Sequence, residues 1–354
     1  MADSIRATWI HPSGVLRVPR LPPVLARNLP WLLLVLLSIT FAEFLTGSTF
    51  VFLPLLNPLS AVFLVGLYGA GVLLVREARV RWRKGWPTVL LLGAAYGIAE
   101  EGLGTKTFFG PAGVGHLAVY GHWIGVNWVW AVELAAFHAI FSIALPIAVV
   151  ALVFPETEGR SFLPTRRALG FVLATFLATV AAMFVLFNRP EIPSAALVVA
   201  SVAAIALLIV LARRAPRGLG DLGVGRAVVP SVLGPFALGA AFVWGFFGLS
   251  WLGPPLIPAA AVTGIAILAW CVVFGVHLAR HREEYQRPAA RLEFVLGSLT
   301  FSLVLASIYT VFGDFGAPLA VAGVVLLGLR LRARLRVPMG ADAARAPAEA
   351  VAAT

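Results

Sequence analysis

The chain has 354 residues, of which 60% are hydrophobic and only 12% are charged, whereas soluble domains are nearer one quarter charged. This composition excludes a soluble protein and predicts a polytopic membrane protein whose main partner is the lipid bilayer. The net charge of +11 does not indicate nucleic-acid binding, because loop arginines that face anionic lipid account for it. The single cysteine, Cys271, excludes a framework of disulfides.

Ten apolar runs along the chain indicate membrane spans. They occupy residues 30–47, 58–76, 87–107, 124–153, 168–187, 194–212, 229–252, 257–278, 292–312 and 317–330. A polar segment, 1–29, precedes the helical domain of 30–336, and the Ala- and Pro-rich tail of 337–354 is predicted to be disordered. The sequence therefore predicts an all-α transmembrane helix bundle.

The basic residues predict the orientation of this bundle. Of the 27 lysines and arginines, all but Lys106 and Arg189 fall in segments that the ten spans place on one side of the membrane. Cytoplasmic loops carry such an excess of basic residues, so both termini are predicted to be cytoplasmic. We expect a multi-pass protein of the inner (plasma) membrane.

Carboxylates inside the spans are the strongest functional signal. Glu100 and Glu101 are adjacent within the third span, and acidic residues in a membrane interior are expensive and functional by default. At a rise of about 1.5 Å per residue, Glu43 of the first span and Glu133 of the fourth reach the same depth as this pair. His138 follows Glu133 by about a turn and a half on the same span. The sequence therefore predicts one acidic layer with a histidine near it.

Such a layer cannot stay fully ionised in hydrocarbon without compensation. Protons shared among carboxyls in a wet cavity are one solution, and a bound divalent cation is the other. We expect Lys106 to line this cavity and Asp314, at the outer end of the ninth span, to rim it. Some members also have structural interpretations: Glu43 can mark the end of its span, and His138 can be a packing residue.

The order of these residues resembles that of the CPBP family of intramembrane proteases, which includes the CAAX prenyl endopeptidases. That family has a Glu-Glu-x-x-x-Arg motif in one helix and a Phe-x-x-x-His motif in the next. Here Glu100 and Glu101 precede His138 in the next span, and the resemblance covers about residues 88–150.

Two motif positions depart from the family pattern. Thr105 stands where the motif has arginine, with Lys106 beside it. Leu134 stands four residues before His138, with Phe137 adjacent to the histidine instead.

The resemblance implies a glutamate-dependent intramembrane hydrolase, a peptidase acting on a membrane-embedded or lipid-linked peptide. It implies that Glu100 or Glu101 activates a water, directly or through a metal, and that His138 stabilises the oxyanion. Two other classes remain open on the residues alone. One is an ion- or proton-coupled transporter that uses the same carboxylates, and the other is a non-catalytic membrane scaffold.

Overall fold

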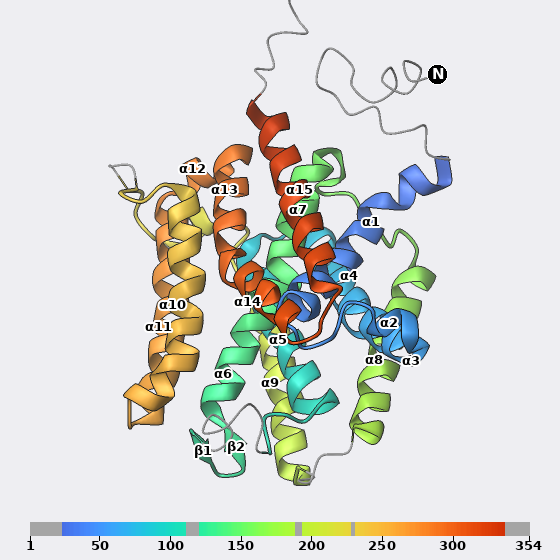
Figure 1. The fold of residues 1–354 in the computed structure, drawn as a ribbon, viewed down its shortest axis with the longest axis vertical. Coiled ribbons are helices and arrows are strands. Elements are labelled where there is room, and N and C mark those ends of the chain that lie inside the picture. Colours follow the sequence, from blue (N-terminus) through green and yellow to red (C-terminus); the bar gives the residue numbers. More distant parts are fainter. Residues whose placement is uncertain (1–22, 111–119, 188–192, 228–230, 337–354) are drawn as a thin grey trace, which may run out of the picture.

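The computed structural model describes residues 23–110, 120–187, 193–227 and 231–336, and this part of the chain is almost entirely helical (Figure 1). The predicted disordered tail and most of the polar N-terminal segment lie outside the described residues. The α-helices, in chain order, are α1 (Pro23–Ile39), α2 (Leu53–Leu56), α3 (Pro58–Leu64), α4 (Ala70–Arg81), α5 (Trp86–Ile98), α6 (Trp128–Phe137), α7 (Leu145–Val153), α8 (Arg166–Leu186), α9 (Ala195–Arg214), α10 (Pro235–Leu256), α11 (Ala260–Arg280), α12 (Arg282–Gln286), α13 (Pro288–Ser298), α14 (Thr300–Val311) and α15 (Ala317–Arg336).

Shorter elements complete the described chain. Four π-helical segments are η1 (Thr40–Phe44), η2 (Val65–Gly69), η3 (Ala99–Gly104) and η5 (His138–Ala144). Two 3₁₀ turns are η6 (Pro155–Thr157) and η7 (Leu219–Leu222). Strands β1 (His122–Trp123) and β2 (Val126–Asn127) form a small antiparallel hairpin.

Eight helical segments of the described chain are long and apolar enough to cross a membrane. They are Arg27–Phe44, Pro58–Arg81, Trp128–Val153, Arg166–Leu186, Ala195–Arg214, Pro235–Leu256, Ala260–Arg280 and Pro288–Val311. Each matches one of the ten predicted spans, so the prediction of an all-α polytopic bundle is confirmed.

The other two predicted spans also form helices, but they are less apolar. Helix α5 continues into η3, and this stretch carries the adjacent pair Glu100 and Glu101. Helix α15 carries four arginines toward its end: Arg330, Arg332, Arg334 and Arg336. The two glutamates and the four arginines therefore lower the hydropathy of these two helices.

The bundle has two halves that meet along α6 and α7. In the first half, α5 is central and packs against α4, α6, α9 and η5. In the second half, α10 packs against α11 and α13, and α13 packs against α15. The halves join where α11 contacts α6 and α13 contacts α7. Figure 1 shows α12 and the end of α15 at one end of the bundle and the β1–β2 hairpin at the other.

The beginning of α1 and the end of α15 lie toward the same end of the bundle (Figure 1). Both described ends of the chain therefore fall on one side, as an even number of spans requires. That this side is cytoplasmic stays a prediction from the arginine distribution.

Two glycines set the spacing between α5 and the helix formed by α6 and η5. A Cβ at Gly93 would lie 2.6 Å from the Cα of Ala139, and one at Gly97 would lie 3.1 Å from the Cα of Ala135. Glycines four residues apart allow membrane helices to approach closely. This approach brings η5 and its first residue, His138, against η3.

Candidate functional site

His138 lies between the two adjacent glutamates. Its Nδ1 is 3.2 Å from Oε2 of Glu100, and its Nε2 is 3.2 Å from Oε1 of Glu101. The exposed fractions are 2% for Glu100, 9% for Glu101 and 2% for His138. Consecutive side chains of a helix point about 100° apart. The two glutamates accordingly contact different ring nitrogens of the one imidazole.

Each member of this cluster stands in a π-helical segment. A π turn inserts one residue into an α-helix and re-aims the side chains around it, and such turns are frequent at functional sites. Segment η3 carries both glutamates, and η5 begins at His138. Segments η1 and η2 carry Glu43 and Tyr68, which join the cluster.

Glu101 is held rigidly by hydrogen bonds. Its Oε2 accepts from the hydroxyl of Thr105 at 2.8 Å and from the hydroxyl of Thr107. Its Oε1 faces Nε2 of His138. Both carboxylate oxygens are therefore engaged, and Glu101 fixes the orientation of the imidazole.

Glu100 is linked to a third carboxylate through a tyrosine. The buried hydroxyl of Tyr68 contacts Oε1 of Glu100 and also Oε1 of Glu43. The other oxygen of Glu43 accepts from Thr49. One hydroxyl has one proton and can donate to one ionised carboxylate only. Tyr68 can therefore donate to only one of Glu43 and Glu100 at a time.

Two buried polar atoms of the cluster form no hydrogen bond within the described part of the chain. They are Oε2 of Glu100 and the hydroxyl of Tyr96, whose side chain is 4% exposed. The Tyr96 ring lies edge-on to His138 with centroids 5.8 Å apart, and its hydroxyl lies close enough to Glu100 to interact with it, although without the geometry of a well-formed hydrogen bond. The two unpaired atoms thus belong to one location beside the imidazole.

Segment η5 has a local cause in the sequence. Pro146 is the second residue of α7 and has no N–H to donate to the carbonyl of Ser142, four residues earlier. That carbonyl accepts from the hydroxyl of Ser38 of α1 at 2.6 Å instead. The Ser142 hydroxyl lies 2.8 Å from Nδ1 of His138. The proline therefore frees a carbonyl that ties α1 to the segment carrying the histidine.

The remaining predicted site residues have other partners. Glu133 is buried and hydrogen-bonds to Ser250 of α10. Within the described residues, the hydrogen bonds of the Glu100–Glu101–His138 cluster do not reach it. A place for Glu133 in a shared cavity stays a prediction.

Lys106 and Asp314 brace elements around the cluster. The ammonium of Lys106 donates to the carbonyl of Phe184 near the end of α8 at 2.5 Å. Asp314 accepts from the backbone N–H of Gly316 at 3.1 Å and of Val51 at 3.4 Å. Val51 is two residues beyond Thr49, so Asp314 supports the segment that reaches Glu43. Cavity roles for Lys106 and Asp314 stay predictions.

Sequence reasoning did not single out Tyr68, Tyr96, Thr107 or Ser142. A signal existed for the tyrosines, because each lies mid-span beside glycines, and a buried tyrosine hydroxyl requires a partner. The pair Gly93 and Gly97 around Tyr96 also matches the small-residue spacing of close helix contacts. The hydroxyls of Thr107 and Ser142 had no such signal.

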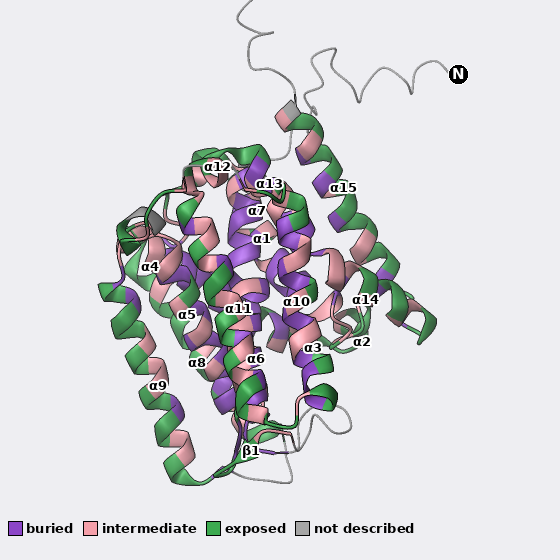
Figure 2. Ribbon diagram, turned by 90° about the vertical axis from the view of Figure 1, so that its left-hand side faces the viewer, coloured by how far each residue is buried: buried purple, intermediate pink, exposed green. Residues whose placement is uncertain are grey.

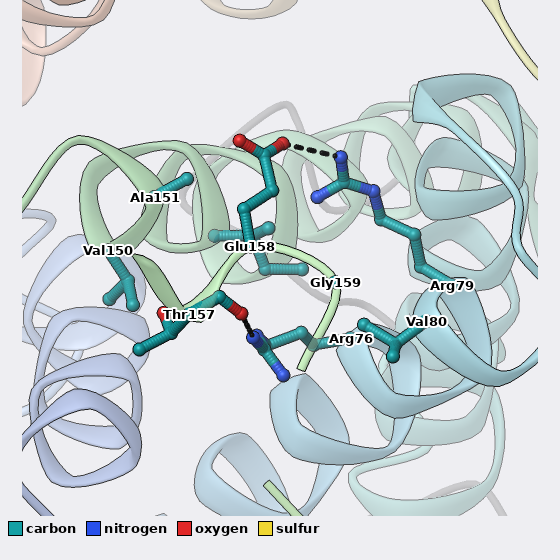
Figure 3. A pocket seen from close by; sticks show the side chains of 9 residues that line it. Arg76, Arg79, Val80, Val150, Ala151, Thr157, Glu158 and Gly159 are labelled. Atoms are coloured by element: carbon teal, nitrogen blue, oxygen red, sulfur yellow. Dashed lines mark hydrogen bonds and ion pairs between the residues drawn. The ribbon is translucent and has the colours of Figure 1, made fainter. Parts of the chain in front are cut away.

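A surface hollow lies about two turns beyond Tyr68 along the same helix, at Arg76 and Arg79 (Figure 3). Its volume is about 10 Å³, which is room for about one water molecule. Arg76 donates to the carbonyl of Thr157 at 2.8 Å, and Arg79 pairs with Glu158 at 3.1 Å. These contacts tie the loop after α7 to α4, and the hollow has no room for an organic ligand.

The fold and the cluster define a polytopic α-helical membrane protein with a buried glutamate–histidine site. Residues 32–342 match the model of a family described as an uncharacterised membrane protein family, and the chain belongs to that family. No curated protein and no solved structure matches the chain. The family match supports a multi-pass membrane protein, and it does not extend the resemblance to the CPBP family.

Proposed function

We propose that this protein is a glutamate-dependent intramembrane hydrolase that cleaves a membrane-embedded or lipid-linked peptide. The observation that carries the proposal is the convergence of Glu100, Glu101 and His138 from two helices at one buried location. The proposal places the protein in the inner (plasma) membrane with both termini in the cytoplasm.

The hydrogen bonds assign different roles to the two glutamates. Glu101 has both oxygens engaged, so it orients His138. Oε2 of Glu100 has the ion-pair contact with Nδ1 of His138 but no hydrogen bond in the described chain, so Glu100 is the candidate general base. A general base must reach the water that it deprotonates, and Oε2 is the oxygen of Glu100 that is left to make such a contact.

The proposed reaction uses the two polar atoms without a hydrogen bond, Oε2 of Glu100 and the hydroxyl of Tyr96. Glu100 accepts a proton from a water whose oxygen attacks the peptide carbonyl carbon. The free hydroxyl of Tyr96 donates to the oxyanion that develops, a role that the CPBP resemblance would give to His138. The carbon–nitrogen bond breaks, and Glu100 returns the proton to the leaving amine. His138 balances the change in charge on Glu100.

Lateral access from lipid supports a membrane-embedded substrate. Helices α8 and α9 both pack on η3, yet only 17% and 11% of their spans are buried. Figure 2 shows α9 as a mostly exposed helix at the edge of the bundle. A single layer of helix therefore separates the carboxylates from surrounding lipid, and parting α8 from η3 opens the site sideways.

The test uses purified protein in proteoliposomes with two probes, a fluorescence-quenched transmembrane peptide and a prenylated peptide. We expect cleavage of at least one probe, seen by mass spectrometry, and its loss in Glu100→Gln. Val199→Ala, on the lipid-facing surface of α9, is the control. Equal cleavage in Glu100→Gln and wild type, or no cleavage of either probe, contradicts the proposal.

A proton-coupled carrier is the second candidate, and the bridge at Tyr68 is the observation that favours it. This hydroxyl joins Glu43 and Glu100 in a chain that shares one proton across three helices. A carrier predicts proton uptake into proteoliposomes that Glu100→Gln abolishes, without cleavage of either peptide.

A further inference from the structure

We propose that Glu100, Glu101 and His138 bind one divalent transition-metal ion of the zinc class. Each residue offers one ligand atom, and these three atoms lie within 4.8 Å of one another. The metal deepens the proposed hydrolase, on which its catalytic meaning rests: with Oε2 of Glu100 bound as a ligand, the ion would take over from Glu100 the activation of the attacking water. Binding itself is measurable without any substrate.

The donor set selects the class of metal. Two carboxylate oxygens and one imidazole nitrogen suit zinc, whose catalytic sites keep three protein ligands and one open position. Calcium requires six to eight oxygen ligands, more than this cluster supplies. Ligand bonds of about 2.0–2.2 Å place tetrahedral donors about 3.4 Å apart. Nε2 of His138 and Oε1 of Glu101 already lie 3.2 Å apart.

The unpaired atoms give a second, independent reason. The Tyr96 hydroxyl and Oε2 of Glu100 are both buried without a hydrogen bond in the described chain. Leaving a buried polar group unpaired costs about 1–3 kcal/mol. A cation would satisfy the Glu100 oxygen, and a water in the open position of its coordination shell would accept from Tyr96.

The cluster also gathers carboxyl groups in one buried location. Glu43, Glu100 and Glu101 are linked there through Tyr68 and His138. The ammonium of Lys106 is engaged with the carbonyl of Phe184. A bound cation would offset the cost of burying these carboxyl groups together.

The experiment measures zinc alone in the whole protein, purified in detergent and stripped with a chelator. We expect one zinc ion per chain by elemental analysis after dialysis against micromolar zinc. Glu101→Gln and His138→Ala should each weaken zinc affinity on the order of 100-fold or more, measured by competition with a fluorescent chelator. His277→Ala, a histidine of α11 beside Ser231, is the matched control and should bind as wild type.

Glu101→Gln keeps the size of the side chain, so a circular dichroism melt separates loss of a ligand from loss of the fold. Wild-type protein that binds no zinc, or folded Glu101→Gln and His138→Ala that bind it undiminished, overturns the metal site. Hydrolysis that persists in stripped protein overturns the role of the metal in catalysis and leaves the hydrolase standing. Zinc binding with the expected losses but without hydrolysis supports the metal and contradicts the hydrolase.

Discussion

Replacing Gly93 by alanine tests how the cluster is assembled. The added Cβ would lie 2.6 Å from the Cα of Ala139 and 3.1 Å from its carbonyl oxygen. Non-bonded carbon atoms pack at about 3.5–4.0 Å, so α5 and η5 must separate by about 1 Å at this level. Both clashing atoms belong to a helix backbone, which cannot move aside as a flexible side chain can.

Overpacking of this kind costs about 1–3 kcal/mol in a well-packed interior. It should also lengthen the 3.2 Å contact between His138 and Glu101, because η5 begins one residue before Ala139. Gly93→Ala should therefore lower both the free energy of unfolding and the affinity for zinc. Gly97→Ala should have a smaller effect, since its Cβ would meet its nearest neighbour at 3.1 Å.

Unfolding by SDS in mixed micelles, followed by tryptophan fluorescence, measures the loss of stability. The control is Gly170→Ala on α8, where an added Cβ meets nothing within 4 Å. Wild-type stability in Gly93→Ala, or a loss no larger than that of Gly170→Ala, would refute the view that close helix approach builds the site.

Three further outcomes are expected. In a Cys271→Ser background, the double variant Gly104→Cys/Met183→Cys should form a disulfide, because the two Cβ positions lie 3.7 Å apart. If α8 must part from η3 to admit substrate, this disulfide should block peptide cleavage. Free thiols, or cleavage that is undiminished, would count against this opening. Tyr68→Phe should destabilise the protein by about 1–3 kcal/mol in SDS titration, because two carboxylates lose their shared partner, and unchanged stability argues against that bridge. A tag beside Arg217 should resist external protease in intact cells, and external cleavage reverses the predicted orientation.

Hydropathy was sufficient to predict the helical architecture, whereas the orientation inferred from arginine placement stays a prediction. The predicted spans 58–76 and 124–153 correspond to Pro58–Arg81 and Trp128–Val153 of the structure. Each span is set by about 20 successive residues that must avoid water. Such a signal is local in the chain, so it does not depend on how the helices pack.

The site was less predictable, because depth along a helix says nothing about rotation around it. Matched depth placed Glu43, Glu100 and Glu133 in one layer. The structure joins Glu43 to Glu100 through Tyr68, whereas Glu133 bonds to Ser250 of α10. A straight-helix estimate also separates Glu133 from His138 by about 140°. The π turns that aim the cluster have no simple pattern in the sequence.

The polar atoms without a hydrogen bond also bear on the choice between a working site and a scaffold. A scaffold built on buried acids would pair every oxygen, as Glu101 does with Thr105, Thr107 and His138. Glu100 and Tyr96 break that pattern at one location. Each unpaired atom costs about 1–3 kcal/mol, and lipid offers no water in compensation. Apolar residues of similar size would avoid that cost. We therefore expect an apolar replacement of the cluster to be more stable, an expectation that favours a role in binding or chemistry over one in holding helices together.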